Sequence, residues 1–268
     1  LKMAKLTLKA LKQTYTQSKR ENDAVHMGFI SYNILRPISF PLTIPFLKLG
    51  FSPNQVTFLG LITGMSGVLS LATGTYDWML IGAILINFAA LLDMVDGNIA
   101  RYHKSGSYYG DFMDGVVGNT FQGLIPFALG IGISKFESNH LNISSENVII
   151  LGGVVTVIYY LPVYIAWRFR AQSLMVKLEN IEHPEKNSKL STSLTSNEES
   201  ISKDRMKKFA RAVISRTKKI RGDIFMPILF LIYFGWASII LATYLLIFSF
   251  EAFLSITFTF FRARIFLR

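Results

Sequence analysis

The chain is dominated by apolar blocks of about 20 residues, the length that an α-helix needs to cross the hydrocarbon core of a bilayer. Of its 268 residues, 51% are hydrophobic and 17% are charged, whereas a soluble domain carries about 25% charged residues. Backbone polar groups inside a bilayer must be satisfied by the chain itself, which blocks of this length achieve as helices. The sequence therefore predicts an all-α, polytopic membrane protein.

Six transmembrane helices are expected from these blocks. Their predicted bounds are 54–73, 77–101, 107–134, 147–169, 223–244 and 247–265. The last two are weakly separated, because Phe250 and Glu251 interrupt the apolar run and suggest a tight turn near Ser249. A re-entrant hairpin is the alternative interpretation of that region.

The N-terminal part of the chain looks interfacial rather than membrane-spanning. Residues 3–27 place apolar side chains at helical spacing among lysines, which predicts a helix lying at the membrane surface. Residues 28–50 contain three prolines and predict a broken amphipathic segment at the same surface; the prolines are Pro37, Pro41 and Pro45. We therefore expect an interfacial segment over 1–50 and a membrane domain over 51–268, without a removable signal peptide.

The basic residues gather beside the apolar blocks. Half of the 28 Lys and Arg lie between Arg168 and Arg221, and a further quarter lie between Lys2 and Arg36. Cytoplasmic segments of membrane proteins carry such an excess, so both termini and a polar, basic insertion at about 170–222 are predicted to be cytoplasmic. Within this insertion, 182–200 is expected to be a loop and 201–221 a basic surface helix. The same placement argues against nucleic acid as a partner.

Four aspartates lie at the adjoining ends of two predicted spans: Asp93, Asp96, Asp111 and Asp114. A charge at the centre of a membrane helix costs roughly 2.5–3.5 kcal/mol on insertion scales, and a divalent cation compensates several carboxylates at once. The chain has no cysteine and only four histidines, which leaves oxygen ligands and favours Mg²⁺, Mn²⁺ or Ca²⁺. Carboxylates from two helices can hold two divalent ions for displacement at phosphorus, a task that suits Mg²⁺.

Helical spacing gathers these residues on two faces. One face of the first helix carries Asp93, Asp96, Gly97, Ala100 and Arg101. One face of the second carries Gly110, Asp114 and Gly118, with Asp111 one turn from Asp114. The short connection between the helices predicts that they are antiparallel and adjacent, with their carboxylates facing each other near the cytoplasmic interface. Arg101 offers planar donors to a phosphate. Inter-helix ion pairs and an ion or proton transport pathway are the alternatives.

These residues resemble the signature of the CDP-alcohol phosphotransferases, D-x2-D-G-x2-A-R-x8-G-x3-D-x3-D. Seven of its eight fixed positions are present, from Asp93 to Asp114. The segment 53–57 (Pro-Asn-Gln-Val-Thr) is also similar to the P-N-x-x-T entry into the family's first helix. The resemblance covers roughly residues 28–265. It implies a six-helix membrane enzyme of phospholipid biosynthesis, commonly homodimeric, that transfers a substituted phosphoryl group from a CDP-linked donor to an alcohol and releases CMP.

The resemblance also implies a role for each matching residue. The metal ligands would be Asp93, Asp96 and Asp114. The cytidine diphosphate would be bound by Asp96, Gly97, Ala100, Arg101 and Gly110, with Asn54 and Thr57 closing the site from the first span. Helix capping is the simpler interpretation of Asn54 and Thr57 when they are considered alone.

The eighth position of the signature departs from the family, because Gly118 stands where an aspartate serves as metal ligand and general base. Asp111 is one candidate replacement, as a metal ligand and as a catalytic group beside Asp114; otherwise it is a residue favoured by the dipole at a helix N-terminus. A water molecule or the acceptor's own phosphate could instead take the proton. The remaining alternative is a relative that binds CDP-alcohols without efficient turnover.

Two arginines at the cytoplasmic end of the fourth predicted span, Arg168 and Arg170, are candidates for the acceptor site. They could bind a phosphate on the acceptor alcohol. They could equally be positive-inside anchors beside an aromatic belt.

Overall fold

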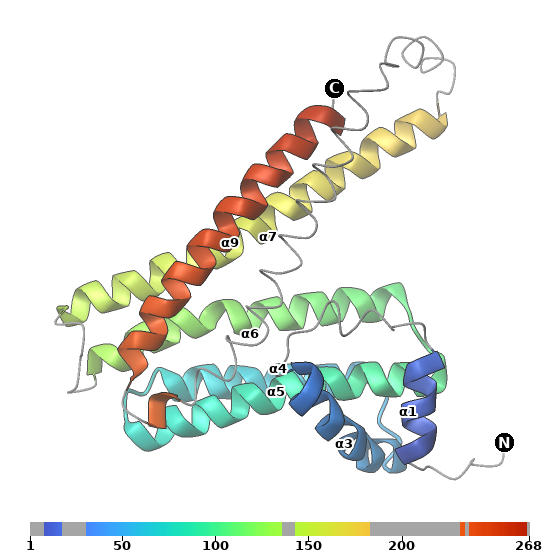
Figure 1. Ribbon diagram of the computed structural model, residues 1–268, viewed down its shortest axis with the longest axis horizontal. Helices are drawn as coiled ribbons and strands as arrows, with labels where there is room; N and C mark the ends of the chain where they lie inside the picture. Colours follow the sequence, from blue (N-terminus) through green and yellow to red (C-terminus); the bar gives the residue numbers. More distant parts are fainter. Residues whose placement is uncertain (1–7, 18–30, 136–142, 183–230, 234–235, 267–268) are drawn as a thin grey trace. The chain divides into compact units, whose positions relative to one another are not determined.

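The computed structural model describes residues 8–17, 31–135, 143–182, 231–233 and 236–266 (Figure 1). Within these ranges the chain is helical and contains no strand. The helices are α1 (Leu8–Gln17), the π-helix η2 (Ser31–Leu35), α3 (Arg36–Lys48), α4 (Pro53–Leu71), α5 (Tyr76–His103), α6 (Tyr108–Lys135), α7 (Ser145–Glu182) and α9 (Ala237–Phe266). The all-α class expected from the sequence is thereby confirmed.

Five of these helices are long and apolar enough to cross a membrane: α4, α5, α6, α7 and α9. The first four coincide with the first four predicted spans, and α4, α5 and α6 differ from the predicted bounds by no more than two residues. Arg168 and Arg170 do not end the fourth span as predicted, because α7 continues to Glu182. Leu174, Met175 and Leu178 continue the apolar character of the helix beyond the arginines.

The predicted turn near Ser249 is wrong, because α9 runs unbroken from Ala237 to Phe266. A turn within an apolar run would expose backbone N–H and C=O groups to the bilayer, whereas one continuous helix satisfies them and carries a single acidic residue, Glu251. Of the predicted fifth span, residues 237–244 form the first part of α9, whereas 223–230 and 234–235 lie outside the described residues. The expected loop at 182–200, apart from Glu182, and the basic helix at 201–221 lie outside them too.

The proline-rich segment before the first span is a continuous helix, not the broken segment predicted from its sequence. Pro37 lies in the first turn of α3, where no intrahelical N–H bond is lost. Pro41 and Pro45 follow at intervals of four, so all three prolines share one exposed face. The opposite face is buried and carries Arg36, Ser39, Phe40, Thr43 and Leu47. The lost backbone hydrogen bonds therefore fall on the face that is exposed.

Contacts divide the chain into two compact units, the first comprising 1–156 with 219–246 and the second 157–218 with 247–268. In the second unit, the later parts of α7 and α9 pack together through aromatic and cationic side chains. Tyr159 and Phe248 make an edge-to-face pair with ring centroids 5.3 Å apart. The Arg262 guanidinium lies 5.2 Å from the centre of the Phe169 ring.

In the first unit, α4 and α5 pack with their backbones in close approach. A Cβ added at Gly67 would lie 2.9 Å from the Gly82 carbonyl oxygen, and a Cβ added at Gly82 would lie 2.7 Å from that of Gly67. Small residues at such crossings are the usual means by which membrane helices pack. The pair thus fixes α5 against α4.

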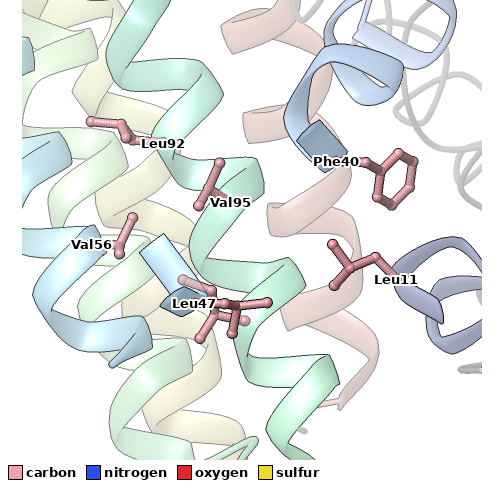
Figure 2. Close-up of a cluster of buried hydrophobic side chains, with 7 residues drawn as sticks. Leu11, Phe40, Leu47, Val56, Leu92 and Val95 are labelled. Carbon is pink, nitrogen blue, oxygen red and sulfur yellow. The ribbon is translucent and has the colours of Figure 1, made fainter. Parts of the chain in front are cut away.

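A buried apolar cluster joins the N-terminal helices to the end of α5 (Figure 2). Its members are Leu11 of α1, Phe40 and Leu47 of α3, Val56 of α4, and Leu92, Val95 and Ile99 of α5. Figure 1 shows α1 and α3 beside the end of α5 from which the chain turns into α6. On the same stretch of α5, the polar residues Asp93 and Asp96 lie between members of this cluster in the sequence.

Candidate functional site

The N-terminus of α4 is capped by residues other than Asn54 and Thr57. Ser52 is the N-cap: its hydroxyl accepts from the Gln55 backbone N–H at 3.4 Å, and the Gln55 side chain accepts from the Ser52 N–H at 2.8 Å. This is a capping box, so neither Asn54 nor Thr57 is needed as a cap. The capping interpretation of these two residues is therefore wrong.

Thr57 instead points from α4 to α5. Its hydroxyl donates to an Asp96 carboxylate oxygen at 2.6 Å, and it also lies 3.1 Å from the Pro53 carbonyl oxygen. Both Thr57 and Asp96 are 7% exposed. Hydrogen bonds to charged groups contribute about 1.5–3 kcal/mol, so this contact fixes the orientation of the Asp96 carboxylate.

Three of the four aspartates lie near enough to interact electrostatically. The side chains of Asp93 and Asp114 are close enough for a hydrogen bond, and the Asp114 carboxyl group acts electrostatically on both Asp93 and Asp96. Asp93 and Asp114 are exposed, whereas Asp96 is buried. Carboxyl groups from α5 and α6 therefore face each other at the end of the helix pair, as the spacing predicts.

The sequence predicts that the two helices that carry these carboxyl groups are adjacent, but α5 and α6 are not packed against each other along their length. Helix α4 packs against both α5 and α6, while α5 and α6 make few contacts with each other. Gly64 of α4 lies against the Phe121 ring of α6, and Gly67 of α4 lies against Ile86 of α5. Because α4 has small residues toward both neighbours, it separates α5 from α6, which meet near their acidic ends.

Arg101 lies directly over Gly97. A Cβ added at Gly97 would be 3.1 Å from Nη2 of Arg101 and 3.4 Å from Nη1. Nη2 of the guanidinium donates a hydrogen bond to Oδ1 of Asn98 at 2.9 Å, and the guanidinium charge attracts the Asp96 carboxylate. Helix α5 ends at His103, and the next residue, Lys104, has a left-handed backbone with φ of 52°. The Ser105 N–H then donates to the carbonyl oxygen of the half-buried Ala100 at 3.0 Å.

Ser107 directly precedes α6 and bonds to its first turn. Its hydroxyl accepts from the Gly110 N–H at 3.0 Å, and its carbonyl accepts from the Asp111 N–H at 3.1 Å. A Cβ added at Gly110 would lie 3.8 Å from Oδ1 of Asn54, so the start of α4 approaches the start of α6 here. Asp111 is exposed in the first turn of α6 and is not among the main groups that act electrostatically on Asp93 or Asp96. This position favours the helix-dipole interpretation of Asp111.

Gly118 lies one turn after Asp114 on α6 and is half-buried. A Cβ added there would meet one neighbouring atom within 4.0 Å, Nε2 of Gln122. The position therefore has room for the aspartate that the signature carries.

Arg36 is a basic residue of the site that the sequence did not single out. It is 6% exposed at the start of α3 and acts electrostatically on Asp93. Its guanidinium lies 4.2 Å from the centre of the Tyr15 ring. The spacing of Ser39 and Thr43 from Arg36 on one face of a helix was the available signal, but the prolines concealed that helix.

The donor set can be compared with the needs of a divalent cation. The acidic groups that interact here are the carboxylates of Asp93, Asp96 and Asp114, and carboxylate oxygens are suitable ligands for Mg²⁺ or Mn²⁺. Among the described residues, no three Asp, Glu or His side chains converge closely enough to hold a metal ion together. Ligation would therefore require side-chain rotation of the exposed carboxylates, whereas Asp96 is already held by Thr57.

Arg168 and Arg170 are exposed on the part of α7 that belongs to the second unit. The residues described above all belong to the first unit.

Comparison with known proteins identifies this arrangement of residues. The sequence profile of the family described as CDP-alcohol phosphatidyltransferase matches residues 51–250, which include all of α4, α5 and α6. The chain belongs to this family. The family signature thus lies on α5 and α6 and forms the acidic cluster just described, while α1 and α3 precede the matched region.

Curated relatives within the family match over part of the chain. A bifunctional IPC transferase and DIPP synthase of Aquifex aeolicus is 34% identical over 34% of this chain and 20% of its own length. A phosphatidylinositol phosphate synthase of Mycobacteroides abscessus is 31% identical over 38% of this chain and 47% of its own length. The chain therefore spans less than half the length of the curated relatives that it matches.

Solved structures of a family member also align with the chain. The phosphatidylinositol phosphate synthase of Mycobacterium tuberculosis in complex with manganese and citrate has a TM-score of 0.46 and 18% identity over 84% of this chain and 87% of that one. The same protein with CDP-DAG bound has a TM-score of 0.45 and 19% identity over 86% and 92%.

Proposed function

We propose that this protein transfers a substituted phosphoryl group from a CDP-linked donor to an alcohol, with release of CMP, as a membrane enzyme of phospholipid biosynthesis. The observation that carries the proposal is the meeting of Asp93, Asp96 and Asp114, from two helices, beside Arg101. The signature residues of the family thus lie at the adjoining ends of α5 and α6, and a site at these ends of the spans would be reached by a polar ligand from the membrane surface.

The carboxylates would hold one or two divalent ions, Mg²⁺ or Mn²⁺, between α5 and α6. Bound there, such ions neutralise phosphate charge and stabilise the entering and leaving oxygens of an in-line displacement. Asp96 supplies an oriented carboxylate because Thr57 donates to it, and Asp93 and Asp114 supply exposed carboxylates from the two facing helices. Asp111 is a further candidate ligand that would have to reach the site from the first turn of α6.

The remaining residues would bind and orient the donor. Arg101 presents its guanidinium for the diphosphate, and Gly97 leaves the space that this guanidinium occupies. Gly110 leaves space for the nucleotide near Asn54, which closes the site from α4. Ala100, with its small side chain, allows close approach at the end of α5.

The reaction would form one bond and break another at the β-phosphorus of the donor. The alcohol oxygen attacks this phosphorus while its bond to the bridging oxygen of CMP breaks. The hydroxyl proton passes to Asp114 or Asp111, because Gly118 provides no carboxylate. Arg168 and Arg170 remain candidates for an acceptor that carries phosphate.

Three broader expectations belong to the same proposal. Helices α1 and α3, which carry the basic residues Lys12 and Arg36, contact α5, and this supports a cytoplasmic site and cytoplasmic termini. A homodimer and the division into 1–50 and 51–268 are likewise proposed.

The proposal is tested by purified protein in liposomes, supplied with CDP-diacylglycerol, Mg²⁺ or Mn²⁺, and a panel of alcohols that includes inositol phosphate and glycerol phosphate. We expect CMP release that requires both the metal and an acceptor. Absence of CMP release and of CDP-alcohol binding would overturn the proposal. Ion flux across the liposomes without CMP release would favour a transporter.

One observation favours a second candidate function, a relative that binds CDP-alcohols without efficient turnover. Gly118 lacks the expected base although the position has room for one. Binding without turnover, in both the unchanged protein and a Gly118→Asp variant, would support this alternative.

A further inference from the structure

The guanidinium of Arg101 is held by a buried polar network that reaches outside the family signature. Nη2 of Arg101 donates to Oδ1 of Asn98 at 2.9 Å. The other end of the same amide, Nδ2 of Asn98, donates to the hydroxyls of Ser39 at 3.1 Å and Thr43 at 3.0 Å on α3. One asparagine thereby joins α3 to the arginine of the site.

The network is buried, and the hydroxyls of Ser39 and Thr43 each donate one hydrogen bond and accept another within it. Ser39 and Thr43 are 0% exposed, and Asn98 is 3% exposed. Ser39 donates to the Arg36 carbonyl at 2.8 Å, and Thr43 donates to the Ser39 carbonyl at 2.7 Å, so both hydroxyl oxygens are turned as acceptors toward Asn98. The Asn98 amide is thus fixed in the orientation that presents its oxygen to Arg101, because an inverted amide would place two donors together.

Helix α1 contributes from another side. The Tyr15 ring lies 5.5 Å from the Arg101 guanidinium carbon and 4.2 Å from that of Arg36. Leu11, one turn before Tyr15, is buried in the apolar cluster with Phe40 and Val95, which fixes α1 against α3 and α5 (Figure 2). A single aromatic ring therefore lies near both guanidinium groups of the site, within the range of a cation–π interaction.

We infer that Asn98 and Tyr15 are positioning residues that hold the Arg101 guanidinium for the diphosphate of the donor, so that α1 and α3 form part of the nucleotide site. Both helices precede residues 51–250, which match the family, and Asn98 occupies an unspecified position of its signature. A guanidinium held in advance loses less conformational entropy on binding, so the network raises nucleotide affinity without contacting the nucleotide. This inference rests on the proposed function.

The test measures the affinity for CDP, in the presence of MnCl₂, of the full chain in detergent by isothermal titration calorimetry. Asn98→Leu removes both ends of the amide at similar volume, and we expect affinity to fall about tenfold. In an Arg101→Ala background the same change should alter affinity less than about twofold, because Asn98 acts through Arg101. Equal losses in the two backgrounds would overturn the inference and indicate a general structural role.

Asn87→Leu is the matched control, since Asn87 is a buried asparagine on the same helix that donates to the Ala83 carbonyl at 2.8 Å. It should leave CDP affinity unchanged even if thermal stability falls. An equal loss of affinity in Asn87→Leu would contradict a specific role for Asn98.

Tyr15 keeps the inference testable if Asn98→Leu fails to fold. Tyr15→Phe retains the ring and should preserve CDP affinity. Tyr15→Leu should lower CDP affinity about threefold when Arg101 is present, and should have no effect when it is combined with Arg101→Ala. Identical affinities of the Phe and Leu variants would overturn the role of Tyr15. Failure of the unchanged protein to bind CDP would instead contradict the proposed function and the inference that rests on it.

Discussion

The two halves of the acidic cluster differ in how firmly the fold holds them. On α5, Asp96 accepts from Thr57 and Arg101 donates to Asn98, and these polar contacts lie against the apolar cluster that includes Val95 and Ile99. On α6, Asp111 and Asp114 are exposed, and a Cβ added at Gly115 would meet nothing within 4 Å. The α5 half therefore holds Asp96 and Arg101 within packed structure, although its Asp93 is exposed, whereas both aspartates of the α6 half are exposed.

This difference suggests a division of work within one site. The α5 half has fixed groups suited to orient a nucleotide and one metal ligand, because pre-organised groups bind a ligand at lower entropic cost. The α6 half has groups that can rotate to complete the set around a cation or to reach a proton. Substitutions on α5 should accordingly damage binding, and substitutions on α6 should be tolerated structurally while changing turnover.

The largest effect is expected from Asp96→Asn. The amide has nearly the same shape and can still accept from Thr57, but it lacks the charge that a divalent cation requires. We expect CMP release to fall by about 100-fold or more, since even residues that merely support a metal ligand are worth 10–100-fold. Asp77→Asn, in the first turn of the same helix, is the control. Similar activities of the two variants would contradict the role of the α5 half.

Gly118→Asp tests the open half. The added Cβ meets only Nε2 of Gln122, at 4.0 Å, so the variant should fold with unchanged thermal stability. If Gly118 marks a missing base, turnover should rise at least about tenfold, because a positioned general base contributes 10²–10⁴-fold. The measurement is the initial rate of CMP release at saturating metal and donor. If the unchanged protein releases CMP and the variant is no faster, Asp111, Asp114 or a water molecule already serves as base. If neither protein releases CMP, the result supports a relative without turnover.

Thr57→Val sharpens the comparison by removing one hydrogen bond from the buried half. The substitution keeps the shape of a side chain that is 7% exposed and deletes the 2.6 Å contact to Asp96. We expect the Mn²⁺ concentration needed for half-maximal activity to rise about tenfold. Thr63→Val, on the same helix, removes a 2.8 Å bond to the Leu59 carbonyl and should leave the metal dependence unchanged. A shift of equal size in both variants would indicate a general effect on α4.

The smallest effect is expected from a matched pair of glycine substitutions. In Gly97→Ala the new Cβ would lie 3.1 Å from Nη2 of Arg101, so the guanidinium must move by a few tenths of an ångström and CDP affinity should fall about threefold. Gly115→Ala meets no neighbour and should leave affinity unchanged while favouring the helix. Titration calorimetry with CDP and MnCl₂ distinguishes the two. Equal responses would mean that the halves do not differ as described.

Much of the membrane architecture was predictable because hydrophobic length alone determines where a chain can span a bilayer. The bounds of α4, α5 and α6 follow the apolar blocks, and the facing of Asp93 and Asp114 follows from helical periodicity and a short connection. The packing of α4 between α5 and α6 could not be predicted in this way, since it depends on which small residues meet which partner, as Gly67 meets Gly82.

The contacts that support the site were also beyond local reasoning. Asn98 looked like an ordinary polar residue between Gly97 and Ile99, and its partners Ser39 and Thr43 lie more than 50 residues earlier in the chain. The prolines of α3 suggested a broken segment, because their common exposed face appears only once the opposite face is packed against α5. The unbroken course of α9 does not follow from local sequence, because Phe250 and Glu251 resemble an interruption of the apolar run, whereas a continuous helix satisfies the backbone hydrogen bonds that a turn would leave open.

The most direct test asks whether the two halves form one metal-dependent nucleotide site. CDP binding should be measured by titration calorimetry with and without MnCl₂ for the unchanged protein, Asp93→Asn on α5 and Asp114→Asn on α6. We predict that the unchanged protein binds CDP much more tightly with Mn²⁺, and that either substitution alone abolishes this dependence. CDP binding that is indifferent to Mn²⁺, or that keeps its Mn²⁺ dependence in both variants, would contradict the account.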